Sequence, residues 1–208
     1  MGVAADERRE LCELFERVGA DAPTLCDGWR TRDLAAHLVL REHRPDAAAG
    51  ILVPALASHT ESVQGRYAAQ PWAQLVERVR KGPAWFWPTR LPPLNELINS
   101  AEFLVHHEDV RRAQEGWEPR PADTKRDEAA WRSIRAIAKL TLRGSADGIV
   151  LRTPAHGEVT AKAGPDPVTV LGEPVEILLF VFGRDAVRLE FDGDAAAVER
   201  LKSLSRGL

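Results

Sequence analysis

Two apolar segments that carry ionisable side chains constrain this chain most strongly. Residues 33–40 read DLAAHLVL, and residues 99–109 read NSAEFLVHHED. A histidine or glutamate that is buried in such a segment without a partner is strongly destabilising, because it loses its hydration and gains nothing in return. The fold must therefore supply partners for His37, Glu102 and His106. One divalent metal ion would satisfy all three side chains together.

The apolar periodicity of the first half of the chain predicts helices. A run of inward positions at helical spacing starts at Thr31, which we expect to be the N-cap, and includes His37 and Arg41. Glycine and proline residues mark where the helices begin and end. Four principal helices are expected, at residues 4–18, 31–41, 71–81 and 94–114, with a shorter helical segment at 46–56. Four helices in this length predict an up-down bundle.

After residues 117–122 the pattern changes, and strands appear among the helices. Short alternating or β-branched runs predict strands at 149–152, 158–161, 168–171 and 187–191, and longer runs predict helices at 123–142, 173–182 and 195–204. The chain is therefore expected to have the α+β fold class, with a helical domain at residues 1–118 and a small α+β domain at 119–208.

The composition excludes several classes of function. The chain has 208 residues with a formal net charge of -3, and its basic residues form no stripe of the kind that binds nucleic acid. No apolar run approaches the roughly 20 residues that span a bilayer, and the charged N-terminus has no signal-peptide core. We therefore expect a cytoplasmic protein that binds neither nucleic acid nor membrane.

The spacing of the ionisable residues suggests a metal site. Glu102 and His106 are four residues apart, so their side chains leave one face of a helix about one turn apart. With His37 from another helix they form a His₂Glu set, which is typical of catalytic zinc sites with one open position. Spacing alone leaves the alternative open, because Glu-His pairs at this spacing often lie on solvated faces and an isolated histidine is often a hydrogen-bonded core residue.

Other ionisable residues near these segments receive supporting or surface roles. Asp109 lies one further turn along and is expected to orient a histidine from outside the metal shell. Arg41 has the right phase to meet an anionic ligand, and Arg184 is a second candidate for that role. His107 points about 100° away from His106, so we expect it to meet solvent or the domain interface. Residues 41–44 are expected to form a solvated helix end.

The two cysteines are expected to be reduced thiols. Cys12 falls on the inward face of the first helix and is expected in the core. Cys26 lies in a predicted turn, and nothing near it in sequence would activate it as a nucleophile. The tryptophans are expected to be packing residues, including Trp85 and Trp87 in a proline-rich loop.

The two segments also carry a family resemblance. Residues 28–38 (GWRTRDLAAHL) resemble the tryptophan-to-histidine signature of the N-terminal domain of mycothiol-dependent maleylpyruvate isomerases, within the DinB-like metal-binding bundle superfamily. Residues 102–113 (EFLVHHEDVRRA) resemble the second signature, in which a glutamate and a histidine four apart complete the metal site. Residues 172–194 resemble the C-terminal domain of such isomerases, which is related to sterol-carrier folds.

This resemblance is strongest to an actinobacterial subgroup described only as metal-binding proteins. It implies a zinc-type site at His37, Glu102 and His106, and an actinobacterial cytoplasm in which mycothiol is the main small thiol. The chain departs from the pattern at His107 and Glu108, where many isomerase-like members have a Gly-Trp pair. The resemblance therefore does not imply the isomerase activity itself.

Three functions follow as hypotheses. The first is a thiol-dependent metalloenzyme in which the open metal position activates a low-molecular-weight thiol, such as mycothiol, for isomerisation or conjugation of a small electrophile. The second is a metal-dependent hydrolase that activates water at the same position. The third is a non-enzymatic small-ligand-binding protein with a structural metal, in which Asp109 or His107 supplies a fourth ligand.

Overall fold

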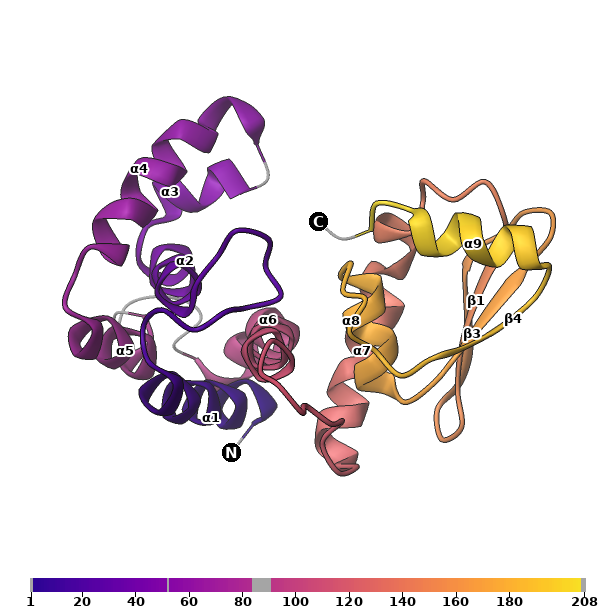
Figure 1. Ribbon diagram of the computed structural model, residues 1–208, viewed down its shortest axis with the longest axis horizontal. Coiled ribbons are helices and arrows are strands. Elements are labelled where there is room, and N and C mark those ends of the chain that lie inside the picture. Colours follow the sequence, from indigo (N-terminus) through magenta and orange to yellow (C-terminus); the bar gives the residue numbers. More distant parts are fainter. Residues whose placement is uncertain (1, 52, 84–90, 207–208) are drawn as a thin grey trace. The chain divides into compact units, whose positions relative to one another are not determined.

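The structure, a computed structural model, describes residues 2–51, 53–83 and 91–206. It contains two compact units, Met1–Glu118 and Pro119–Leu208 (Figure 1). The first unit is helical and the second combines helices with a four-stranded sheet, so the predicted α+β class is confirmed. Among the described residues, none of the helices has both the length and the apolar character needed to cross a membrane.

The helical unit is built around α1, α2, α5 and α6, whose inward apolar side chains form one core. Phe15 on α1, Leu38 on α2, Leu75 on α5 and Phe103 on α6 are all fully or almost fully buried in it. The elements of this unit are α1 Val3–Val18, α2 Thr31–His43, α3 Pro45–Ala48, the 3₁₀ turns η1 Ala49–Ile51 and η2 Pro54–Leu56, α4 Ala57–Ala68, α5 Trp72–Lys81 and α6 Pro92–Arg112.

The start of α2 differs from the prediction. Arg30, and not Thr31, is the N-cap, and the Asp33 carboxylate accepts a hydrogen bond from the Arg30 backbone N–H at 2.9 Å. The Thr31 hydroxyl instead donates to the Gly19 carbonyl at 2.6 Å. This contact ties the beginning of α2 to the end of α1, so it helps to fix the helix that carries His37.

The helix α4 was not predicted, and the helical segment expected at 46–56 is in fact α3 followed by two 3₁₀ turns. Only Thr60 and Val63 of α4 are buried. Val63 packs with Leu40 and Ala47 in a small separate cluster. Two inward positions in twelve residues are too few to produce a recognisable helical period.

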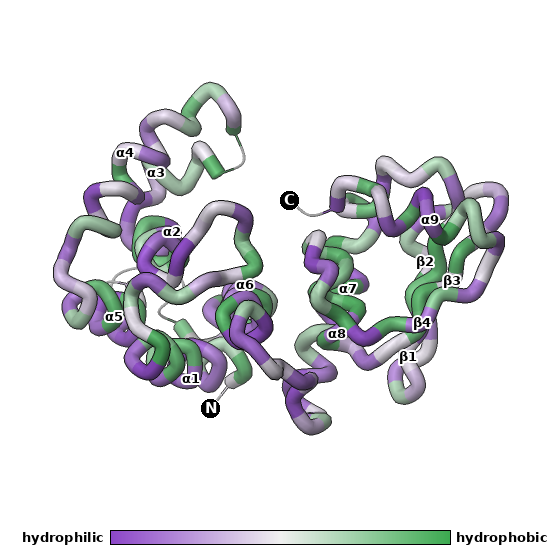
Figure 2. Tube along the Cα trace, viewed as in Figure 1, coloured by the Kyte–Doolittle hydropathy of each residue, from purple (hydrophilic) through white to green (hydrophobic). Residues whose placement is uncertain are grey.

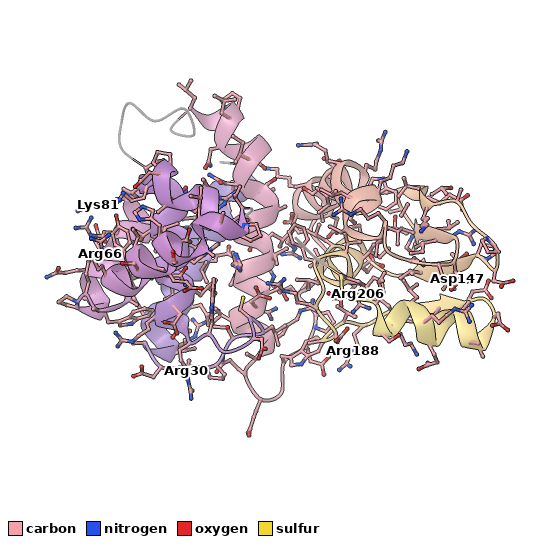
Figure 3. All side chains as sticks on the ribbon, turned by 90° about the horizontal axis from the view of Figure 1, so that it is seen from above. Arg30, Arg66, Lys81, Asp147, Arg188 and Arg206 are labelled. Carbon is pink, nitrogen blue, oxygen red and sulfur yellow. The ribbon has the colours of Figure 1, made fainter. Side chains whose placement is uncertain are left out.

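Charged side chains lie around the outside of the helical unit. Figure 3 labels three of them, Arg30, Arg66 and Lys81, all of which are exposed. Trp72 packs edge-on against Phe15 at 5.5 Å between ring centroids, as a packing residue should, whereas Trp85 and Trp87 lie outside the described residues.

The C-terminal unit packs helices against a sheet with the strand order β2-β1-β3-β4. The pair β1–β2 is antiparallel, β1–β3 is parallel and β3–β4 is antiparallel. Figure 2 shows hydrophobic residues concentrated along α7, α8 and the strands. The elements of this unit are α7 Thr124–Thr141, β1 Ile149–Thr153, β2 Gly157–Lys162, β3 Val168–Leu171, α8 Pro174–Val181, β4 Glu190–Asp192 and α9 Ala195–Ser203.

The strand expected at 187–191 is shorter than predicted. The Arg188 backbone N–H donates to the Glu176 carboxylate at 2.7 Å, so it is not available to a strand ladder. Pairing with β3 begins only at Glu190. Phe191 then contacts Phe180 of α8 at 5.6 Å between ring centroids, which ties this edge strand to the core.

Candidate metal centre

The structure brings together the three side chains that the sequence singled out. His37 lies in the middle of α2, and Glu102 and His106 lie one turn apart on α6. The Nε2 atoms of His37 and His106 are each 3.3 Å from Glu102 Oε1. The two imidazole rings stand nearly perpendicular, with centroids 5.4 Å apart. All three groups therefore direct a ligand-type atom to one point.

These separations suit a small divalent cation. In tetrahedral coordination with bonds of about 2.0–2.1 Å, two ligand atoms lie about 3.3–3.4 Å apart. The His37 and His106 nitrogens both have that separation from Glu102 Oε1, and the ligand-type atoms of the set all lie within 4.8 Å of one another. The donor set and its spacing thus fit a zinc-type ion, whose presence stays a prediction.

Burial and neighbouring charges determine which groups are protonated. His37 and His106 are each 8% exposed. Burial lowers the pKa of His37 and outweighs the hydrogen bond to Glu102, so its imidazole is neutral. Burial alone would raise the pKa of Glu102, but His106, His37 and the charge of Arg41 bring it well below its ordinary value. Glu102 is therefore a carboxylate, as a metal ligand must be.

Asp109 holds the other nitrogen of His106. Its Oδ2 lies 2.9 Å from His106 Nδ1, and the carboxylate is fully buried. Burial lowers the pKa of His106, but hydrogen bonds with Asp109, Cys26 and Glu102 raise it well above the ordinary value. Because a carboxylate only accepts, Nδ1 must carry the proton. Nε2 is then the nitrogen that can face a cation, once any second proton leaves it.

Cys26 corrects a prediction. The sequence indicated no activating group nearby, but Cys26 Sγ lies 3.2 Å from Asp109 Oδ2 and 4.0 Å from His106 Nδ1. The thiol donates to the same carboxylate oxygen that accepts from His106. The Leu25 backbone N–H also donates to the Asp109 carbonyl at 3.0 Å, which fixes this turn against α6. No feature of the local sequence indicates this contact, because Cys26 and Asp109 are 83 positions apart.

The prediction that residues 41–44 form a solvated helix end is also wrong. Glu42 is buried and pairs with Arg8 of α1, whose Nη1 donates to Glu42 Oε2 at 2.6 Å. Arg41 turns to the candidate site instead, with its Nε 3.3 Å from Glu102 Oε1. Arg184 lies in the C-terminal unit, where its guanidinium donates to the Phe182 carbonyl at 2.6 Å. Anion binding by Arg41 or Arg184 stays a prediction.

His107 and Glu108, where the chain departs from the isomerase pattern, are both buried. His107 Nδ1 pairs with Glu7 Oε2 of α1 at 2.7 Å. Glu108 accepts a hydrogen bond from Arg112 Nε at 2.6 Å and from Arg111 Nη1 at 3.0 Å. Of the two expected surroundings of His107, solvent is therefore wrong, because a partner on α1 makes its burial favourable, and the domain interface stays a prediction.

Trp29, which opens the first signature segment, forms part of the surroundings of the site. Its ring centroid lies 5.1 Å from that of His37, with the planes tilted by 49°. The Trp29 backbone carbonyl accepts a hydrogen bond from Thr24 at 2.9 Å, so the turn that carries it is fixed. An indole in this position limits the orientations that the His37 ring can take.

Comparisons with known proteins give a likeness of fold. No protein-family model matches the sequence, and no curated protein matches it significantly. Two solved structures match over 91% of this chain and 90% of their own, with a TM-score of 0.60 and 15% sequence identity. They are the mycothiol-dependent maleylpyruvate isomerase and a histidine-to-alanine mutant of it. At this identity the match establishes a shared fold.

Proposed function

We propose that the protein is a thiol-dependent metalloenzyme with its metal held by His37, Glu102 and His106. Two imidazole nitrogens that converge on one carboxylate oxygen at 3.3 Å carry this proposal. The fold shared with a mycothiol-dependent isomerase supports it. In this proposal residues 1–118 are a DinB-like four-helix metal-binding bundle, and residues 119–208 are a sterol-carrier-like domain.

The geometry favours a metal with an open position over a closed structural site. Asp109 binds the Nδ1 side of His106, and His107 pairs with Glu7. Neither of the two residues considered as a fourth ligand is therefore placed on the Nε2 side of His106. An open position can take a small-molecule ligand, which is the arrangement of catalytic zinc sites.

The thiol in this reaction comes from outside the protein. The thiol of Cys26 hydrogen-bonds to Asp109 and lies next to His106 Nδ1, the nitrogen that points away from the ligand set. A zinc-type ion supplies Lewis acidity that keeps a bound thiol deprotonated at neutral pH. Mycothiol is the natural candidate, and the substrate is a small electrophile that undergoes isomerisation or conjugation.

The residues of the chain have distinct roles in this proposal. His37, Glu102 and His106 hold the metal, and Asp109 fixes the proton of His106 on Nδ1. The nearby Trp29 ring contributes an apolar wall beside His37. A hydrolase acting through metal-bound water would use the same ligands, so the two activities differ in whether a thiol binds at the open position.

Metal analysis and thiol titration test the proposal. Purified protein should hold one zinc per chain, and His37→Ala should lose it while an exposed control, His59→Ala, retains it. Titration of the cobalt(II) form with mycothiol should produce a sulfur-to-cobalt charge-transfer band. Wild-type protein that takes up no zinc contradicts the metal site. Uptake of zinc with no spectral response to thiol favours the hydrolase or the ligand-binding protein.

A further inference from the structure

Arg41 is held tightly beside the candidate metal centre. Its Nε lies 3.3 Å from Glu102 Oε1, the oxygen on which both imidazoles converge. Its Nη1 donates to Asn99 Oδ1 at 2.6 Å. The Arg41 side chain is 23% exposed, so water screens its charge only in part. A fixed positive charge therefore lies against the metal-ligand carboxylate.

Asn99 is the residue that fixes Arg41. It is 1% exposed, and its Oδ1 accepts from Arg41. Its Nδ2 donates to Asn95 Oδ1 at 3.0 Å and to Glu42 Oε1 at 3.3 Å. An aspartate here would place a second negative charge beside Glu42, and an apolar residue would supply none of these contacts. The amide meets both requirements, because its oxygen accepts while its NH₂ group donates twice.

A chain of polar contacts connects Asn99 through Glu42 to α1 and α5. Glu42 is paired with Arg8, which also donates to the Val79 carbonyl at 2.8 Å. The Arg8 guanidinium lies over the Phe103 ring, 4.1 Å from its centroid. Glu42 is therefore held from two sides, and it gives Asn99 a fixed acceptor. Because Asn99 is held by these buried contacts, the packing of the helices fixes the position of Arg41.

We propose that Asn99 is a positioning residue which, through Arg41, makes the metal centre selective for an anionic fourth ligand such as a thiolate. The inference rests on the proposed function. With both imidazoles neutral, as metal binding requires, the charges of Glu102 and Arg41 cancel. A divalent cation at the site then keeps its full charge, which favours an anion over water in the open position.

Arg41 should affect the affinity for the metal and the affinity for the anion in opposite directions. The fixed charge of Arg41 repels the metal and attracts the anion. For charges a few ångströms apart in a partly screened site, each effect corresponds to about a tenfold change in a dissociation constant. A purely structural role for Asn99 predicts the reverse for the metal, because a disordered ligand set binds zinc more weakly. The sign of the change in zinc affinity therefore separates the two roles.

Zinc affinity, measured by competition with a chromophoric chelator, is the first test. Arg41→Gln should bind zinc about tenfold more tightly than wild type. Asn99→Leu should change the affinity in the same direction by less, and should add nothing in the Arg41→Gln background. Arg44→Gln is the matched control, since Arg44 pairs with Asp46 on an exposed surface and its loss changes the net charge equally. Unchanged or weaker zinc binding in Arg41→Gln overturns the inference.

The second test is a titration of the cobalt(II) form with thiocyanate, in which visible absorption reports binding. Arg41→Gln should bind thiocyanate about tenfold more weakly than wild type, and Arg44→Gln should match wild type; equal thiocyanate affinity in Arg41→Gln overturns the inference. Asn99→Leu that binds zinc as tightly as wild type, or more weakly, overturns the role of Asn99; if Asn99→Leu does not fold, Asn99→Ala, which removes the same contacts to Arg41, Asn95 and Glu42, takes its place. A wild-type protein that binds no metal overturns the proposed function as well. If wild type binds metal and Arg41→Gln behaves like it, only the inference fails.

Discussion

Asp109→Asn should weaken zinc binding by about 10–100-fold, which corresponds to about 1.4–2.7 kcal/mol. The carboxylate is fully buried and accepts from His106 Nδ1 at 2.9 Å. An asparagine that turns its NH₂ group toward Nδ1 requires that nitrogen to accept, which moves the proton to Nε2. An asparagine that turns its oxygen toward Nδ1 keeps the tautomer but loses the negative charge. Both arrangements make Nε2 a poorer ligand.

The assay is competition with a chromophoric zinc chelator at neutral pH. Asp21→Asn is the matched control, because Asp21 has an 83% exposed side chain and a long contact of 3.4 Å with Arg32. Unfolding of the metal-free proteins is measured separately, since Asp109 also accepts from Cys26. If Asp109→Asn folds and binds zinc within about twofold of wild type, the role of Asp109 as the support of His106 is refuted.

Two further predictions follow from buried groups in the helical unit. Burial raises the pKa of Cys12 to about 12, so its thiol is protonated at pH 8. A thiol reagent should therefore modify at most one thiol, that of Cys26, in the native wild-type protein, and no thiol in native Cys26→Ser. In denaturant it should modify two thiols per wild-type chain. Fast modification of Cys12 in native protein would contradict its burial. His107→Ala removes the imidazole that pairs with the buried Glu7 at 2.7 Å, which should lower the free energy of unfolding by about 2–4 kcal/mol in urea titrations. The exposed His59→Ala should change it by less than about 0.5 kcal/mol.

Local patterns were sufficient to predict most of the secondary structure. Glycine and proline marked most helix ends, and the three strands at residues 149–171 were predicted from short apolar or β-branched runs. The helix α4 was missed because it buries only two residues. The last strand was overextended because the Arg188 N–H bonds to a buried glutamate elsewhere. The first error comes from a local pattern that is too weak to recognise, and the second from a tertiary contact that overrides the local pattern.

The candidate metal ligands were also predictable only in part from local sequence. The spacing of Glu102 and His106 places them on one face of α6, because helical geometry alone determines that relation. Their meeting with His37, which is 65 positions before Glu102, could not be derived from spacing; it was a hypothesis from the need of three ionisable groups in apolar segments for a partner, and the family resemblance strengthened it. The metal itself stays a prediction. Cys26 was missed for the same reason, since its partner Asp109 lies across the fold.

The buried pair of His107 and Glu7 also affects the candidate metal centre. Ionisable groups of α6 pack on two sides of the helix: the half-buried Glu102 and the buried His106 meet His37 of α2, and the buried His107 meets Glu7 of α1. Burying these groups is favourable only while each keeps its partner. Turning α6 by one residue, about 100°, would break the contacts on both sides at once. The pair of Glu7 and His107 therefore helps to fix the rotation of α6 that presents Glu102 and His106 to His37.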